Sequence, residues 1–429
     1  MRWKLIYPSW RKLEGQTPFH LPPHAPVVVA AEVPDDIELE FADDNVDTLS
    51  LGGHSETTDQ PDLVALSIML TAQLPRAFEI AEYYRGKGVP VLAGGIATML
   101  HWEELSRHVD SVFLGEVEGR LAQVSRDLKH GAIAPVYDYL TDFPAIDSVG
   151  SARRDILNRK RYVYRGVPMV DLVHASRGCR FNCFPCCTPF LGGRQFRPRP
   201  IKKVVEEVQS IDNNRLFFVD NSFAQDAAWQ EELFKALVPL KRKWVCHPIE
   251  NNDHLLELAY EAGCWYVYQA IFDTSDVIRE RVRNYQKHGI AVEGTIILGT
   301  DNHDEDYIRR LVDFLLEIGV DLAEFTILTP FPHSPIREQF EREGRILSND
   351  WAEYTCDRVV FQPKLISPRK LQDLYYYAWE TFYASADQNL KMAELLRKTI
   401  DREIHDGTYQ PSALTSGRRH PRSAPASDQ

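Results

Sequence analysis

The sequence lacks long apolar runs: no stretch approaches the roughly 18 uninterrupted apolar residues that indicate a membrane-spanning helix. Its start, "MRWKLIYPSWRKLEG", also lacks the apolar segment and small-residue cleavage site of a secretory signal. We therefore expect a cytoplasmic protein without a membrane partner. In that compartment thiols stay reduced, so clustered cysteines indicate a metal or redox site rather than a disulfide framework.

Basic residues are also fewer than acidic residues. The chain has 49 Lys and Arg against 62 Asp and Glu, which gives a net charge of −13. This balance argues against a nucleic-acid partner, because phosphates bind to basic surfaces. It suits a cationic small-molecule substrate, although many proteins are acidic for solubility alone.

Residues 1–150 alternate short β-rich runs with helical runs, which is typical of a parallel α/β sheet covered on both faces. Ligands of such Rossmann-like sheets bind beyond the carboxyl ends of the strands, where residues 70–73, 94–97 and 115–119 would gather. The predicted strands are "KLIYPSW", "DIELEFA", "LVALSIML", "VPVLAGGIA" and "SVFLGEVEG", and the predicted helices are "LPRAFEIAEYYRGKG" and "EELSRHV".

A second alternation occupies residues 169–345, after an arginine-rich linker at 151–168. Its six strand–helix units predict a partial or full parallel barrel, with its chemistry at the carboxyl ends of the strands. Residues 346–410 are predicted to form a helical layer, and 411–429 a disordered tail. The predicted barrel strands are "MVDLVHAS", "RLFFVDNSF", "KWVCHPI", "CWYVYQAIF", "IAVEGTIILG" and "DLAEFTILTP".

Four of the seven cysteines lie within nine positions, directly after the first predicted barrel strand: Cys179, Cys183, Cys186 and Cys187. Three thiolates on one short loop can hold three corners of a [4Fe-4S] cluster and leave the fourth iron open. A structural zinc site is the alternative, but such sites usually take two ligands from each of two separated knuckles. The spacing favours the cluster.

The loop "ASRGCRFNCFPC" resembles the cluster loop of the radical S-adenosylmethionine (radical SAM) superfamily. Later runs, "GGRQFRPRPIKKVVEEV", "FFVDNSF", "GTIILG" and "ILTPFPHSPI", resemble signatures of its subgroup with an N-terminal cobalamin-binding domain. The resemblance covers about residues 1–385. It implies a [4Fe-4S] cluster whose open iron binds SAM, and reductive cleavage of SAM to a 5′-deoxyadenosyl radical that abstracts hydrogen from a substrate.

The resemblance assigns Cys179 and Cys183 as cluster ligands but leaves the third ligand open. The usual family spacing selects Cys186, whereas the C-x3-C-x3-C spacing selects Cys187. The latter occurs in the radical SAM diol-dehydratases that deoxygenate aminoglycoside sugars. We favour Cys187, with Cys186 as a structural neighbour.

The sequence also does not decide whether the first domain binds cobalamin. The D-x-H-x-x-G motif of many cobalamin domains is absent: the nearest histidine, His54, lies in "LGGHSE", and "DDNVDTL" has none. Because many cobalamin-dependent radical SAM enzymes lack this motif, the first domain either binds cobalamin without it or is vestigial.

Further site residues follow from the family positions. Asp220, Asn221 and Gln269 correspond to positions that contact SAM. Ile296 and Leu298 correspond to residues that line the adenine. The candidate acid and base groups at the barrel mouth are Glu250, Asp273, which is also a candidate SAM contact, and His333.

The resulting prediction is a radical SAM diol-dehydratase acting on a cationic aminoglycoside sugar such as paromamine, with a methyltransferase or ring-modifying enzyme that uses cobalamin as the alternative. A non-enzymatic iron–sulfur sensor is a third, less favoured hypothesis. The resemblance also implies a flavodoxin-type or ferredoxin-type electron donor. A separate nicotinamide-dependent reductase would complete a dehydration product.

Overall fold

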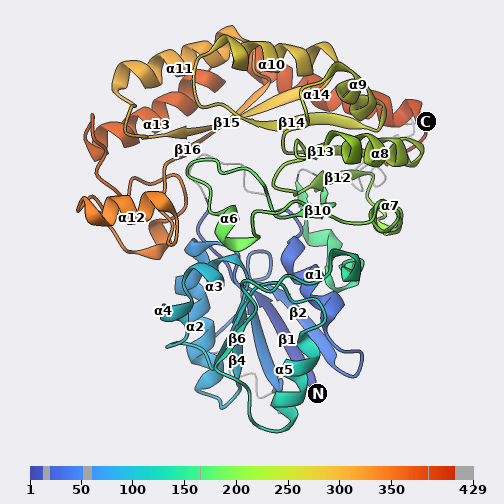
Figure 1. Cartoon of the computed structure of the whole chain (residues 1–429), viewed down its shortest axis with the longest axis vertical. Coiled ribbons are helices and arrows are strands. Elements are labelled where there is room, and N and C mark those ends of the chain that lie inside the picture. The colour runs from blue at the N-terminus through green and yellow to red at the C-terminus, as the bar shows by residue number, and fades with distance from the viewer. Residues whose placement is uncertain (13–19, 52–59, 165, 385, 411–429) are drawn as a thin grey trace, which may run out of the picture.

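The computed structural model describes residues 1–12, 20–51, 60–164, 166–384 and 386–410. Within them the chain forms two α/β units, which lie one above the other in Figure 1 with the N-terminus in the lower unit. None of the helices in these ranges has both the length and the apolar character needed to cross a membrane. His54 and the predicted tail at 411–429 lie outside the described residues.

The N-terminal unit is built on a six-stranded parallel sheet of order β2-β1-β3-β4-β5-β6. Val, Leu and Ile dominate its central strands, and all four residues of β5 are buried, because helices cover both faces. The parallel sheet expected from the alternation is therefore confirmed. Its strands are β1 (Arg2–Tyr7), β2 (Glu38–Asp43), β3 (Leu63–Ser67), β4 (Val91–Gly94), β5 (Ser111–Leu114) and β6 (Val136–Asp138).

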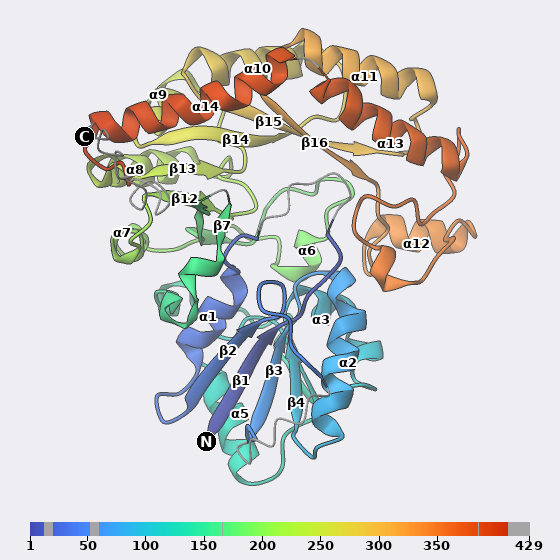
Figure 2. The same ribbon diagram turned by 180° about the vertical axis from the view of Figure 1, so that it is seen from behind.

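Figures 1 and 2 show α2 and α3 along one flank of this sheet and α1 and α5 along the other. The helix predicted at 74–88 is present as α2, but the one predicted at 103–109 is only the short α4. Helices α1 and α5 and strand β6 were not predicted. The helices are α1 (His24–Glu32), α2 (Leu74–Arg85), α3 (Ile96–Leu100), α4 (Trp102–Leu105) and α5 (Leu121–Lys129).

The second unit contains a parallel sheet of order β16-β15-β14-β13-β12-β9, in which every predicted barrel strand is present. Strands β16 and β9 form its two edges, so the barrel is partial rather than closed. The strands are β9 (Asp171–Val173), β12 (Arg215–Phe218), β13 (Lys243–Cys246), β14 (Cys264–Ala270), β15 (Ala291–Leu298) and β16 (Leu322–Ile327). The helices between them are α6 (Thr188–Leu191), α7 (Ile201–Ser210), α8 (Ala227–Leu237), α9 (Asp253–Glu261), α10 (Asp276–Lys287) and α11 (Glu305–Glu317), and α12 (Pro335–Arg342) follows β16.

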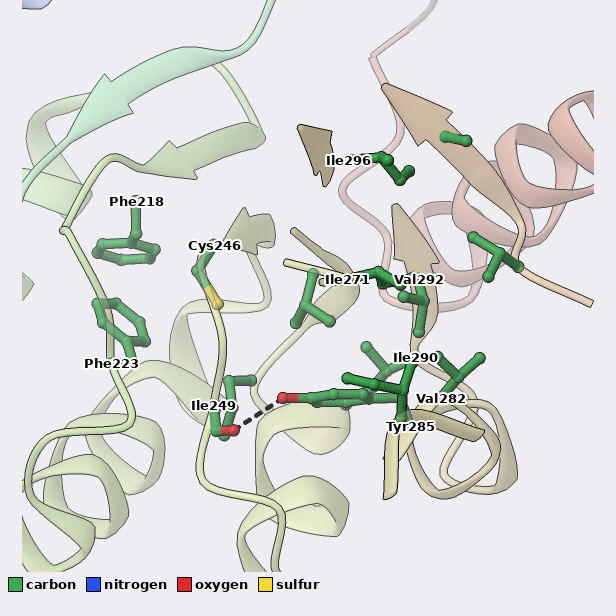
Figure 3. Close-up of a cluster of buried hydrophobic side chains, with 14 of the residues drawn as sticks. Phe218, Phe223, Cys246, Ile249, Ile271, Val282, Tyr285, Ile290, Val292 and Ile296 are labelled. Carbon is green, nitrogen blue, oxygen red and sulfur yellow. Dashed lines mark hydrogen bonds between the residues drawn. The ribbon is translucent and has the colours of Figure 1, made fainter. Parts of the chain in front are cut away.

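The hydrophobic core of this unit lies between the sheet and its outer helices. Figure 3 shows side chains of this core, including Phe218, Cys246 and Ile296. The buried Tyr285 of α10 donates its hydroxyl hydrogen to the carbonyl oxygen of Ile249 at 2.7 Å, so its polar end is satisfied within the core. The face of the sheet that packs against these helices is therefore mainly apolar.

The C-terminal segment forms two helices, α13 (Pro368–Tyr383) and α14 (Ala386–His405). Helix α13 packs beside α11 against β16, and α14 contacts the starts of strands, as in the ion pair of Glu403 with Arg215. The prediction of a helical layer from residue 346 was wrong for its first part: residues 346–367 contain one turn of 3₁₀ helix and a bridge between Ile346 and Phe361. Helix α13 begins where Ser367 accepts a hydrogen bond from the backbone of Lys370, with Pro368 in the first turn.

Candidate active site between the two units

The cysteine loop is closed at its base by two short antiparallel strands, β10 (Ser176–Arg177) and β11 (Arg197–Pro198). Gly178 follows β10 with a φ of +71°, and a Cβ atom there would collide with the carbonyl oxygen of Gln195. The amide of Cys179 donates to the carbonyl oxygen of Gly193 at 3.2 Å. The first cysteine is therefore held in a narrow neck.

The four thiols of the loop differ in environment. Cys179 is buried, Cys183 and Cys186 are exposed, and Cys187 is half-buried at the start of α6. Burial, and then the neighbouring thiols of Cys186 and Cys183, raise the pKa of Cys179. The pKa of Cys187 is raised by burial and by Cys186 alone. The thiols of Cys183 and Cys186 thus act electrostatically on Cys179, and Cys186 also acts on Cys187.

The thiols of this loop, all within the described residues, are not arranged around a single metal ion. Among the residues that the structure describes, no three His, Cys, Asp or Glu side chains converge closely enough to hold one metal ion. The backbone amide of Thr188 lies 3.4 Å from Sγ of Cys186, and the Thr188 hydroxyl lies 3.1 Å from it. These two contacts orient the Cys186 thiol at the start of α6.

Asp220 and Asn221, predicted to contact SAM, lie at the end of β12 and hold the base of the cysteine loop. Both carboxylate oxygens of Asp220 accept from the amide of Ala175, at 2.9 and 3.1 Å, and one accepts from the hydroxyl of Ser176. Burial raises the pKa of Asp220 to about 6, although these hydrogen bonds favour its charged form. Asn221 lies between Thr188 and Gly178, with contacts of 3.4 and 3.5 Å.

A charged cluster joins the N-terminal unit to this neck. Glu116, after β5, accepts hydrogen bonds from Arg177 on β10 and from Arg197 on β11. Arg177 also pairs with Glu118. Burial alone would raise the pKa of Glu116, but the guanidinium groups of Arg197 and Arg177 outweigh it and hold the pKa below its usual value. One carboxylate therefore clamps both ends of the loop.

A cavity of about 760 Å³ opens between the two units, at the carboxyl ends of the N-terminal strands. The three loops expected there do gather around it, and apolar side chains dominate its wall. Gly95 has a φ of +108°, and a Cβ atom there would overlap the carbonyl oxygen of Ile68. From the N-terminal unit the cavity is lined by, among others, Leu70, Gly94, Gly95, Ile96, Gly115 and Glu116, and from the second unit by His174, Arg177, Gly178, Thr188, Asp220 and Asn221.

Two histidines meet across the wall of this cavity. Nε2 of His24 on α1 lies 2.8 Å from Nδ1 of His174, which follows β9. Burial, which is the main cause, lowers the pKa of His24 to about 3 and holds that of His174 well below 6.5. Both rings are therefore neutral at neutral pH, and one donates a hydrogen bond to the other.

This pair predicts acid sensitivity. The unfolded chain binds protons at His24 below pH 6.5, whereas the folded chain resists them down to about pH 3, so stability falls as pH is lowered through this window. His24→Asn should flatten the pH dependence of the free energy of unfolding by about 1.4 kcal/mol per pH unit in this window. Chemical denaturation at several pH values measures this slope, and an unchanged slope in the variant would contradict the assignment.

A second cavity, of about 640 Å³, lies beside the cysteine loop at the carboxyl ends of β14–β16. Asp273 lines it, as do Cys183 and the exposed aromatic side chains of Phe184 and Phe272. Asp273 also accepts a hydrogen bond from the amide of Ser275 at 2.9 Å. Of the three predicted acid–base residues, Asp273 is the one that lines this cavity.

Three predicted contact residues lie on the other face of the sheet. Ile296 and Leu298 on β15 are 1% and 0% exposed and belong to the core under the helices, whereas Ile297 lines the second cavity. Gln269 has the orientation of Val267 and Ile271, which are also core residues. In the structure these three side chains therefore face the core rather than the second cavity, because side chains alternate between the faces of a strand.

Glu250 and His333 lie apart from Asp273. Glu250 is exposed after β13, and its backbone amide donates to Gln230. His333 is exposed with a φ of +57°, and its ring stacks on Phe190 of α6, with centroids 4.6 Å apart. The structure thus brings His333 to the cysteine loop's helix rather than to the second cavity.

The clamp residues Glu116, Arg177 and Arg197 were missed by the sequence analysis. Two carboxylates in "GEVEG" and arginines on either side of the cysteines were visible signals. Their pairing was not, because the partners are 61 and 81 residues apart.

A Rossmann-like unit joined to a six-stranded partial barrel, with a cysteine loop after the first barrel strand, is the fold of radical SAM enzymes of the cobalamin-dependent subgroup. Two solved structures have this fold. The radical SAM methyltransferase TsrM from Kitasatospora setae, with cobalamin and a [4Fe-4S] cluster, matches with a TM-score of 0.64 and 17% identity, over 87% of this chain and 85% of that one. The cobalamin-dependent enzyme OxsB, with aqua-cobalamin and SAM, matches with a TM-score of 0.65 and 14% identity, over 97% and 74%.

The chain is also similar in sequence to curated enzymes. It is 26% identical to bacteriochlorophyllide d C-12(1)-methyltransferase of Chlorobaculum tepidum over 336 residues, which cover 72% of each chain. It is 23% identical to hopanoid C-2 methylase of Rhodopseudomonas palustris over 79% of this chain and 67% of that one. No family model matches the chain.

Proposed function

We propose that the protein is a radical SAM methyltransferase that uses a [4Fe-4S] cluster, SAM and cobalamin. The observation that carries this proposal is the 760 Å³ cavity, which lies at the carboxyl ends of the N-terminal strands and reaches the base of the cysteine loop. A cavity of this size is in the upper part of the range for ligand pockets. It therefore favours an N-terminal unit that binds a large cofactor over a vestigial one.

The relatives reported above are described as methyltransferases or as a methylase, which supports methyl transfer. Diol dehydration of an aminoglycoside sugar, our first hypothesis from the sequence, has no such support. The assay described below would detect such a dehydration. A separate reductase would be needed only in that case.

The donor set of the loop fits a [4Fe-4S] cluster. Cys179 and Cys183 are the proposed ligands, and the electrostatic proximity of Cys186 to Cys179 supports Cys186 as the third, in place of our sequence-based preference for Cys187. Such a cluster supplies the electron for reductive cleavage of SAM. The thiols of Cys183 and Cys186 are exposed, so a flavodoxin-type or ferredoxin-type donor can approach this end of the loop.

The cavity of about 640 Å³ beside Cys183 fits SAM. Ile297 and Leu328 supply apolar surface to this cavity, and Asp273 and Thr300 supply polar groups. Asp220 and Asn221 act on the SAM site indirectly, because their hydrogen bonds hold the base of the cysteine loop in place. We retain Asp273 as the candidate proton-transfer group, since it lines the cavity.

The residues of the larger cavity fit cobalamin. Its wall is mainly apolar, and Gly94 and Gly95 let a ligand approach the backbone after β4 closely. Bound there, cobalamin supplies a methyl carrier between SAM and the substrate. Within the chain, Glu116, Arg177 and Gly178 form the part of the wall that joins this cavity to the cysteine loop.

The experiment that tests the proposal is anaerobic reconstitution with iron, sulfide and cobalamin, followed by incubation with SAM and a reductant. We expect bound cobalamin, formation of 5′-deoxyadenosine and a substrate mass that gains a methyl group. Loss of water from a paromamine-like substrate would favour the dehydratase. A preparation that holds only zinc and never cleaves SAM would contradict both.

Filling the larger cavity should block cobalamin. Gly94 lines it, and a Cβ atom there would meet only Phe113, at 3.8 Å, so the backbone tolerates a side chain. Gly94→Phe should weaken cobalamin binding by about 10-fold to 100-fold, because the added ring occupies the ligand's space. The matched control is Gly150→Phe, where a Cβ atom would meet nothing within 4 Å. Equilibrium dialysis measures the affinity, and equal binding by both variants would exclude this cavity.

A further inference from the structure

Four consecutive strands place polar side chains in one band across the inner face of the barrel sheet. Tyr268 on β14 is directly paired with Glu293 on β15, and Glu324 on β16 is paired with Thr295, two residues beyond Glu293. His247 follows β13, with its ring centroid 5.5 Å from that of Tyr268. We call His247, Tyr268, Glu293 and Glu324 the polar band.

The polar band faces away from the core. The residues next to Tyr268 and Glu293 in the sequence, such as Val267 and Val292, belong to the core under the outer helices. In Figure 1 these helices cover one side of the sheet, and α6 with the cysteine loop lies toward the other. A substrate held between the loop and the sheet would meet the polar band.

Two groups of the band lack hydrogen-bond partners within the described residues. The carboxyl group of Glu293 makes no hydrogen bond or ion pair within the described residues, and the imidazole of His247 makes no hydrogen bond there. Burial, and then the charge of Glu324, raise the pKa of Glu293 to about 8, while burial lowers the pKa of His247 to about 4. Shielded polar groups without partners are costly unless a ligand satisfies them.

We propose that the polar band binds a protonated amino group of the substrate, with Glu293 and Glu324 accepting its hydrogen bonds. The aromatic wall beside the carboxyl groups suits such a cation: Tyr268 stacks on Phe217, with centroids 5.1 Å apart. This inference rests on the proposed function, whose substrate class it narrows to amines. It assigns substrate specificity to side chains that take no part in the proposed cluster, SAM and cobalamin sites.

Amine binding should strengthen as pH rises through about 8, because Glu293 becomes ionised there. The other titratable groups that act on Glu293 are Glu324 on β16, Tyr266 and Tyr268 on β14, and Tyr383 on α13. The pKa of each of these tyrosines is raised above its usual value of 10, so they stay neutral across this range. Among these side chains, only the carboxyl groups of Glu293 and Glu324 are therefore expected to contribute to the pH dependence.

The test compares benzylamine with its uncharged analogue benzyl alcohol on the reconstituted full-length chain, by saturation-transfer NMR titration. The wild-type protein should bind benzylamine about tenfold more tightly, as expected for charge-assisted hydrogen bonds. Glu293→Gln should remove this preference. The matched control is Glu257→Gln, which changes an exposed carboxylate on α9 and should keep it.

Equal affinity for the two probes, or a preference that survives both Glu293→Gln and Glu324→Gln, would overturn the inference. If Glu293→Gln does not fold, Glu324→Gln carries the test. Competitive displacement of benzylamine by SAM would also overturn it, because the polar band would then belong to SAM. The binding assay needs no turnover, so an amine preference without SAM cleavage would refute the proposed function and leave this inference standing.

Discussion

Replacing Cys179 or Cys183 by alanine is expected to abolish the iron–sulfur cluster and all reductive cleavage of SAM. Three thiolates are the minimum that anchors a site-differentiated [4Fe-4S] cluster, and Cys179 is the one thiol of the loop that is buried. The measurement is iron and sulfide content after anaerobic reconstitution, about four of each per wild-type chain. In both variants we expect content near zero and no 5′-deoxyadenosine.

The third ligand is decided by a matched pair of variants within the same loop. Cys186→Ala should be as severe as Cys179→Ala, since the thiol of Cys186 is an electrostatic neighbour of Cys179. Cys187→Ala should retain cluster and activity, and it serves as the control. The reverse result would restore the C-x3-C-x3-C assignment, and full activity in both variants would show that this interpretation of the loop is wrong.

Glu116→Ala should lower the stability of the protein and of its cluster, because it releases the cysteine loop from the N-terminal unit. The variant leaves Arg197, whose side chain is 12% exposed, without its carboxylate partner, whereas Arg177 keeps Glu118. Removing one partner of a buried ion pair typically costs about 3–5 kcal/mol, because the remaining charge stays desolvated. We expect a lower midpoint of thermal unfolding and faster loss of the cluster in air.

The control for this variant is Glu103→Ala, which removes an exposed carboxylate from α4 of the same unit. Glu116→Asp should restore part of the effect, since it keeps the charge but shortens the reach. Cluster lifetime is followed by visible absorbance, separately from thermal unfolding by circular dichroism. If Glu116→Ala unfolds like the wild type and keeps its cluster equally long, the clamp does not hold the loop.

Much of the architecture was predictable because it depends on local patterns. Strand and helix alternate strictly over residues 169–345, and each of the six predicted barrel strands is present. The α1 and α5 helices were missed, and the helical layer was predicted to begin about twenty residues early. The first helix of this layer begins after Ser367, whose side chain caps it with one hydrogen bond. The aromatic-rich sequence around it does not indicate this boundary.

The site was predictable only in part. The resemblance of the cysteine loop assigns Cys179 and Cys183 as ligands, which stays a prediction, and Asp220 and Asn221 lie at the base of that loop. Ile296 and Leu298, proposed to line the adenine, face the core instead, on the same side of β15 as Val292. Glu293 and Thr295 lie on the opposite side, so the alternation in this strand already indicated that orientation. Packing against α10 and α11 decided that Ile297 faces the cavity.

By itself, the sequence determined the fold class and the cysteine loop, since both depend on residues that are close together in the chain. Tertiary structure alone decided how the loop is held and what faces the barrel interior. Glu116 meets arginines 61 and 81 residues away, and the polar band draws one residue from each of four strand units. Such contacts form only when separate strands come into register, and no local pattern records that register.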